Sequence, residues 1–163
     1  MRTQKPYIFL IKLTLLALII GALPLPDIIS NISPFWMLLF FTYWLTYFSN
    51  KWLFFTTLIL GILVDILHGD ILGQNALALI LSTFFILKVK QSLAVSNTTT
   101  QQIYIFGASC IYLFIMLLVH MLSTQSFYFN YYFLFAPLSS ALLWPMVALL
   151  LSKGKNKVVY GKN

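Results

Sequence analysis

Residues 35–67 read FWMLLFFTYWLTYFSNKWLFFTTLILGILVDIL, and this stretch decides how often the chain is expected to cross a membrane. As a single helix it would be about 50 Å long, whereas the hydrocarbon core of a bilayer is about 30 Å thick. The polar break Ser49-Asn50-Lys51 divides it into two helices of about 15 residues each, near the lower limit for a membrane span. Length alone leaves both readings open.

The composition of the whole chain is that of an integral membrane protein. Of its 163 residues, 61% are hydrophobic and 8% are charged, whereas soluble domains carry about 25% charged residues. Ten Lys and Arg against three Asp and no Glu give a net charge of +7. The basic residues stand singly or in short clusters between apolar runs, so they form no polar face for nucleic acid. This pattern argues against a soluble enzyme, a disordered tail and a nucleic-acid-binding module.

The positions of the basic residues favour two helices within 35–67. With six spans and the N-terminus inside, every Lys and Arg lies at the cytoplasmic side, and the outer loops 24–33, 68–70 and 123–130 hold none. With five spans, Lys88, Lys90 and the C-terminal lysines would face outward, against the positive-inside rule. We therefore predict an all-α, polytopic bundle of six transmembrane helices with both termini in the cytoplasm.

The predicted bundle forms a single membrane domain that covers residues 1–163. Its approximate spans are 7–25, 34–48, 52–67, 71–88, 102–122 and 131–152. A short basic cytoplasmic tail, 153–163, follows and carries Lys153, Lys155, Lys157 and Lys162. Such a tail is expected to attract anionic lipid; a contact with a cytoplasmic protein is the alternative.

Local signals predict where some helices begin. Ser33-Pro34 combines an N-cap residue with proline at the first helical position, so the second helix is expected to start there. Asp70 is placed to cap the fourth helix. The polar run from Asn97 to Gln102 is expected to link the fourth and fifth helices.

Residues 61–77 hold the densest group of polar side chains. Asp65 and His68 are three positions apart, so they share a helix face and are placed to pair. A metal site of Asp65, His68 and Asp70 would be incomplete for zinc and poor in oxygen ligands for hard ions. A proton relay would need further ionisable groups across the membrane. The remaining reading, helix packing or partner binding close to the outer surface, is the one the sequence favours.

Small and aromatic residues extend this candidate site. Gly69-x-x-x-Gly73 and Ala17-x-x-x-Gly21 have the spacing that lets helices approach closely. The candidate partner-binding or helix-packing residues are Asp65, His68, Gly69, Gly73, Gln74, Asn75, Trp36, Tyr43 and Trp44. The sequence contains no nucleophile motif, phosphate loop or paired cysteines, so no catalytic, cofactor-binding or metal-binding residue is assigned.

Several short motifs occur in an order and spacing that resemble one known family. They are Pro24-x-Pro26-Asp27, Pro34-x-Trp36, Tyr43-Trp44, Gly61-x-x-x-Asp65, Gly69-x-x-x-Gly73, Ala76-Leu77 and Leu143-Trp144-Pro145. Together, in a six-span chain of this size, they resemble the rod shape-determining protein MreD family. Relatives often carry a proline after the Tyr-Trp pair and an arginine before the helix-starting proline, where this chain has Ser49-Asn50 and Ser33.

The resemblance implies a non-enzymatic subunit of the bacterial elongation machinery. Such proteins sit in the inner membrane beside MreC, with the MreB cytoskeleton inside and the peptidoglycan synthase RodA and its transpeptidase nearby. The family is similar in fold to the substrate-binding subunits of energy-coupling-factor vitamin transporters, so a vitamin-binding subunit is the alternative. A third reading is an enzyme that acts on lipid-linked intermediates, but no side chain stands out to carry that chemistry.

Overall fold

The computed structural model describes residues 6–21, 32–47, 53–69, 71–124 and 131–159. Within these ranges the chain forms helices and turns and no strand, so the predicted all-helical fold is confirmed. The elements are α1 (Pro6–Gly21), α3 (Trp36–Tyr47), α4 (Leu53–His68), α5 (Gln74–Val95), α6 (Thr98–Thr124), the 3-10 helix η1 (Tyr131–Leu134) and α7 (Phe135–Val159).

Three of these helices are long and apolar enough to cross a membrane. They are α5, α6 and the first part of α7, Phe135–Ser152. Helices α1 and α4 have 16 residues each and α3 has 12, fewer than the roughly 20 that a straight span needs. Three spans therefore follow from length and composition, and the six-span topology stays a prediction.

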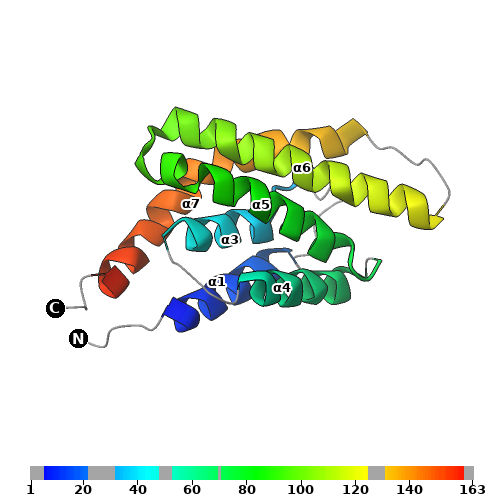
Figure 1. Cartoon of the computed structure of the whole chain (residues 1–163), viewed down its shortest axis with the longest axis horizontal. Helices are drawn as coiled ribbons and strands as arrows, with labels where there is room; N and C mark the ends of the chain where they lie inside the picture. The colour runs from blue at the N-terminus through cyan, green and yellow to red at the C-terminus, as the bar shows by residue number, and fades with distance from the viewer. Residues whose placement is uncertain (1–5, 22–31, 48–52, 70, 125–130, 160–163) are drawn as a thin grey trace.

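Helix α3 lies in the middle of the bundle, where it packs against α1, α5 and α7 (Figure 1). Every side chain from Met37 to Thr46 is buried. Protein therefore surrounds α3 on all sides.

Two serines of α7 hold the segment that leads into α3. The N–H of Phe35 donates to Ser140 Oγ at 3.0 Å, and the hydroxyl of Ser139 donates to the carbonyl oxygen of Ile32 at 2.8 Å. Since the first N–H groups of a helix have no partner within it, the Phe35 N–H at the start of α3 needs such an acceptor. Residues 33–35 are non-helical and bonded to α7, and α3 starts at Trp36, so the helix start predicted at Ser33-Pro34 is wrong.

Two other predicted boundaries also differ from the structure. The polar run from Asn97 to Gln102 is the first turn of α6, which starts at Thr98, and the Gln101 N–H donates to the Asn97 carbonyl at 3.0 Å. At the other end of the chain, α7 continues as a helix to Val159, so the first part of the expected tail is helical.

The outer surface is apolar along the helices. On α1 the exposed large side chains recur at helical spacing: Ile8, Ile11, Leu15, Leu16 and Ile19. The opposite face of the same helix buries Leu13 and Ala17 in the core. A helix with one apolar face in the core and another at the surface fits a lipid environment. Helix α1 begins and α7 ends at the same end of the bundle (Figure 1).

Candidate functional site

Asp65, near the end of α4, is the centre of a buried polar network. Only 1% of its surface is exposed. Its Oδ2 accepts a hydrogen bond from the Gly73 N–H, and its Oδ1 accepts one from the Asn75 N–H, both at 2.8 Å. Since these N–H groups belong to the start of α5, the carboxylate of one helix caps the next and lies at its positive end.

The network continues into a third helix. The side-chain amide of Asn75 donates to Asp65 Oδ1 at 2.9 Å, and the Tyr112 hydroxyl donates to Asn75 Oδ1 at 2.5 Å. Asp65, Asn75 and Tyr112 thus connect α4, α5 and α6 through side chains that are all buried. Asp65 and Asn75 are candidates from the sequence, whereas Tyr112 is not, because nothing in its apolar surroundings on α6 distinguishes it.

Gly61 marks the closest approach of α4 to α5. A Cβ built on Gly61 would lie 2.7 Å from the backbone nitrogen of Ala76 and closer still to its Cα. No side chain fits there, so the two backbones pack directly together one helical turn before Asp65. The sequence signal was present in Gly61-x-x-x-Asp65, which places both residues on one face of α4.

Gly69 and Gly73 do not form the helix-packing motif that their spacing suggested. Both have positive φ, 68° and 93°, and a Cβ on either would meet no atom within 4 Å. They lie in the turn before α5, which starts at Gln74 rather than at 71. The expectation was wrong because the left-handed backbone of a turn requires glycine for conformation and not for close packing. Asp70, the expected cap, lies outside the described residues.

His68 does not pair with Asp65. Its Nδ1 lies 3.0 Å from the carbonyl oxygen of Val64, one turn back on α4. The ring is exposed and faces Gly21, where a Cβ would lie 3.5 Å from Nε2. The expected carboxylate–imidazole pair is absent because the start of α5 takes all the hydrogen bonds that Asp65 makes among the described residues.

The aromatic candidates divide between core and cavity. Tyr43 and Trp44 are each 1% exposed on α3, so they lie in the core and offer no contact surface. Trp36 is half-buried at the start of the same helix. Trp144, on α7, donates through its indole N–H to Gln101 Oε1 at 2.9 Å and so connects α7 to α6. The sequence predicted a place for Gln101 in a polar linker and gave no signal for its bond to Trp144.

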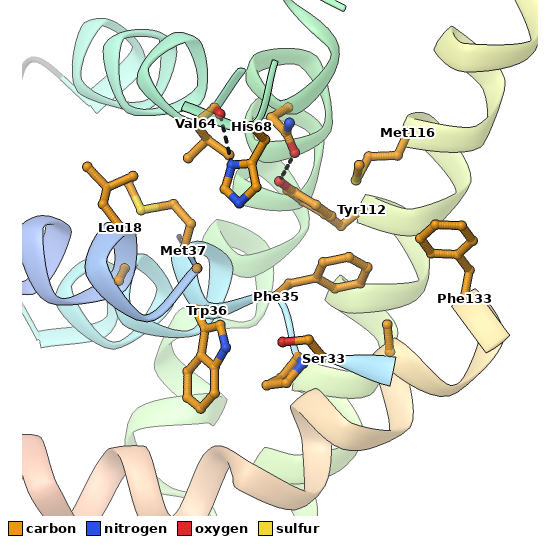
Figure 2. Close-up of a pocket in the computed structure, with 15 residues that line it drawn as sticks. Leu18, Ser33, Phe35, Trp36, Met37, Val64, His68, Tyr112, Met116 and Phe133 are labelled. Atoms are coloured by element: carbon orange, nitrogen blue, oxygen red, sulfur yellow. Dashed lines mark hydrogen bonds between the residues drawn. The ribbon is translucent and has the colours of Figure 1, made fainter. Parts of the chain in front are cut away.

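A cavity of about 200 Å³ opens next to the network. Residues of all six described helices and of η1 line it, at the end of the bundle where α1 and α4 finish and α5 and α7 begin. Figure 2 shows His68, Tyr112 and Phe35 directed toward this space. Of the candidate residues, the cavity brings together Trp36, His68 and Asn75.

The remaining candidates lie elsewhere. Gln74 is buried at the first position of α5. Lys153, Lys155 and Lys157 belong to the last part of α7, and Lys162 lies outside the described residues. In the described part of the chain, no three His, Cys, Asp or Glu side chains converge on a point that would hold a metal ion.

These features define a class of protein: an all-helical membrane protein with an apolar outer surface and a buried polar network that joins its helices. The comparison with known families is more specific. The family described as rod shape-determining protein MreD matches residues 1–154, so the chain belongs to that family, as the motifs suggested. It is 28% identical over 143 residues to the rod shape-determining protein MreD of Haemophilus influenzae, with 88% of each chain covered. No solved structure matches the chain significantly, and the expected likeness to vitamin-transporter subunits stays a prediction.

Proposed function

We propose that this chain is a non-enzymatic scaffold subunit of the machinery that elongates rod-shaped bacteria. It spans the inner membrane six times, binds MreC directly and helps to couple the MreB cytoskeleton to peptidoglycan synthesis by RodA and its transpeptidase. Membership of the MreD family supports the role in rod shape. The contacts of the described residues support a scaffold as the way in which that role is performed.

The arrangement of the helices supports an orientation with both termini in the cytoplasm. Helix α1 begins and α7 ends at one end of the bundle (Figure 1), and α5 carries Lys88 and Lys90 toward that end. The outer loops predicted at the opposite end contain no Lys or Arg. Under the positive-inside rule the lysine-rich end faces the cytoplasm, so the cavity lies at the outer end of the bundle.

The buried polar groups support a structural role over catalysis. Asp65 accepts hydrogen bonds from Gly73 and Asn75, and Asn75 in turn accepts one from Tyr112. A general base must be within reach of a substrate proton. Asp65 is instead enclosed and bonded to the start of a helix, an arrangement that fixes the α4–α5 turn.

That fixed turn is the surface we assign to MreC. Apolar residues at the end of α4 and in the turn are exposed; we define the turn surface as Ile66 and Leu67 of α4 together with Leu72 of the turn. Leu72 is 72% exposed and lies outside any helix. Apolar side chains on a rigid support are suited to anchoring a partner, because little conformational entropy is lost on binding. This exposure is the observation that carries the proposal.

Co-purification of MreC tests the turn surface. Leu72→Glu is expected to lower the amount of MreC retained by about tenfold, equivalent to about 1.4 kcal/mol. Leu122→Glu is the matched control, because Leu122 on α6 is also 72% exposed but lies outside the turn surface. Equal retention of MreC by both variants, at equal membrane insertion, would show that MreC binds elsewhere.

The lysines of the C-terminal segment support a second contact, with anionic lipid. Each is expected to contribute about 1 kcal/mol near the membrane surface. We would replace Lys153, Lys155, Lys157 and Lys162 together by Gln and follow topology and the localisation of MreB. Loss of correct insertion alone indicates a topological role, whereas correct insertion with dispersed MreB indicates a protein contact.

A further inference from the structure

The cavity beside the polar network has a size and a lining that no role described above uses. An apolar cavity of about 150 Å³ holds one benzene molecule. The volume of about 200 Å³ therefore suits one aromatic ring with a small substituent. Sites for larger organic ligands are usually about 300–1,000 Å³, so the cavity is small for a whole vitamin.

The walls favour an aromatic occupant. Phe35 and Tyr112 lie with ring centroids 4.7 Å apart, and Phe133 of η1 adds a third ring to the lining (Figure 2). Met37 and Met116 also line the space, and thioether sulfurs make favourable contacts with aromatic rings. A ring that entered the cavity would therefore meet flat and polarisable surfaces.

Among the polar side chains that line the cavity, His68 gives it a preference for one kind of occupant. A carbonyl oxygen only accepts, so the bond to Val64 requires a proton on His68 Nδ1, and in the tautomer that carries its single proton there Nε2 is an acceptor. Figure 2 shows the His68 ring directed into the cavity. The residues that line the cavity include no Lys, Arg, Asp or Glu. An occupant is thus expected to be neutral and to donate one hydrogen bond.

We propose that this cavity binds a single aromatic ring that carries an O–H or N–H donor, of the phenol or indole class, with His68 Nε2 as the acceptor. The ring is either a free small compound or the Tyr or Trp side chain of another protein. The site does not depend on the binding of MreC by the turn surface.

Binding of three fluorinated probes to the purified full-length protein, followed by ¹⁹F NMR in lipid nanodiscs, tests the proposal. We expect 4-fluorophenol and 5-fluoroindole to bind about fivefold more tightly than fluorobenzene, the ratio that one neutral hydrogen bond gives. His68→Leu should abolish this preference and leave binding of the bare ring. His120→Leu is the matched control, because His120 on α6 does not line the cavity.

Filling the cavity provides the second arm. Gly21→Leu places a side chain toward His68 and should abolish binding of all three probes; Met116→Trp fills the space from α6 and serves if the first variant does not fold. Equal affinity for the three probes in the unmodified protein would overturn the role of His68. Unchanged binding in a folded, filled variant would overturn the site.

The natural source of the ring is then identified with protein purified from native membranes, by adding 4-fluorophenol to displace the occupant of the cavity. A low-mass aromatic compound released by 4-fluorophenol and detected by mass spectrometry indicates a free ligand. A co-purifying protein released by the same probe indicates a side chain. Release of neither would contradict occupancy of the cavity in the cell.

Discussion

Asp65 accepts two hydrogen bonds from Asn75, one from its backbone N–H and one from its side-chain amide. The N-cap residue of α5 itself, Gly73, makes no side-chain capping bond. The carboxylate of the preceding helix supplies the cap in its place. One buried side chain of α4 is thereby bonded to the start of α5, across the turn that joins the two helices.

Removal of this carboxylate is expected to be strongly destabilising. Asp65→Ala leaves two backbone N–H groups and the Asn75 amide without their acceptor, and we expect a loss of about 3 kcal/mol in the free energy of unfolding. Asp65→Asn keeps one acceptor oxygen and should lose less. Thermal unfolding of the purified variants in detergent measures both. An unchanged Tm for Asp65→Ala would show that the cap contributes nothing.

Two glycines provide a matched test of helix packing. A Cβ at Gly61 would collide with the backbone of Ala76, whereas a Cβ at Gly107 would lie 3.3 Å from Cζ of the Phe85 side chain, which can shift. Gly61→Ala should therefore lose about 2–3 kcal/mol, and Gly107→Ala should be close to neutral. Thermal unfolding of the two purified variants measures this difference in stability. A near-neutral Gly61→Ala would mean that α4 and α5 move apart without loss of stability.

The sequence predicted the fold well where long-range patterns decide it. Apolar runs predicted the all-helical fold, and a helix occurs at α4 (Leu53–His68), within one residue at each end of the run 52–67. The six spans inferred from the lysine positions stay a prediction. Motif order predicted the family, which the family match confirms. These features depend on the composition of whole segments, which a single contact does not change.

Prediction was weaker where one tertiary contact decides the local structure. Ser33-Pro34 has the local chemistry of a helix start, but Ser140, 105 residues beyond Phe35, holds the segment out of the helix. Similarly, the sequence did not predict that Asp65 caps α5 through the Gly73 and Asn75 N–H groups. The cap expected from Asp70 lies outside the described residues and stays a prediction. Local sequence shows which side chains are able to cap a helix start, but the tertiary packing decides which of them forms the hydrogen bond.

The turn glycines separate conformational strain from packing. Because Gly73 has φ 93° and open space around its Cβ position, Gly73→Ala and Gly73→Leu should lose similar amounts, about 1–2 kcal/mol. Close helix packing, which the spacing first suggested, would make Leu far worse than Ala. Thermal unfolding of the two variants decides between these cases.

The serine that holds the entry to α3 should also matter for stability. Ser140→Ala leaves the Phe35 N–H without its acceptor and should lose about 1–2 kcal/mol. Ser152→Ala is the control, because its exposed hydroxyl bonds only to the Leu149 carbonyl of its own helix among the described residues. A small effect for both variants in the thermal assay would mean that the segment before α3 is held by other contacts.

Two buried tyrosines should respond to the same change with opposite sign. The Tyr112 hydroxyl donates to Asn75, so Tyr112→Phe leaves Asn75 Oδ1 without that donor and should lose about 1–2 kcal/mol. The Tyr43 hydroxyl is buried and has no hydrogen-bond partner among the described residues. Tyr43→Phe therefore removes an unsatisfied polar atom and should raise the free energy of unfolding by about 0.5–1 kcal/mol. Thermal unfolding in one detergent compares the pair directly, and a loss of stability in Tyr43→Phe would reveal that its hydroxyl contributes through a contact outside the described residues.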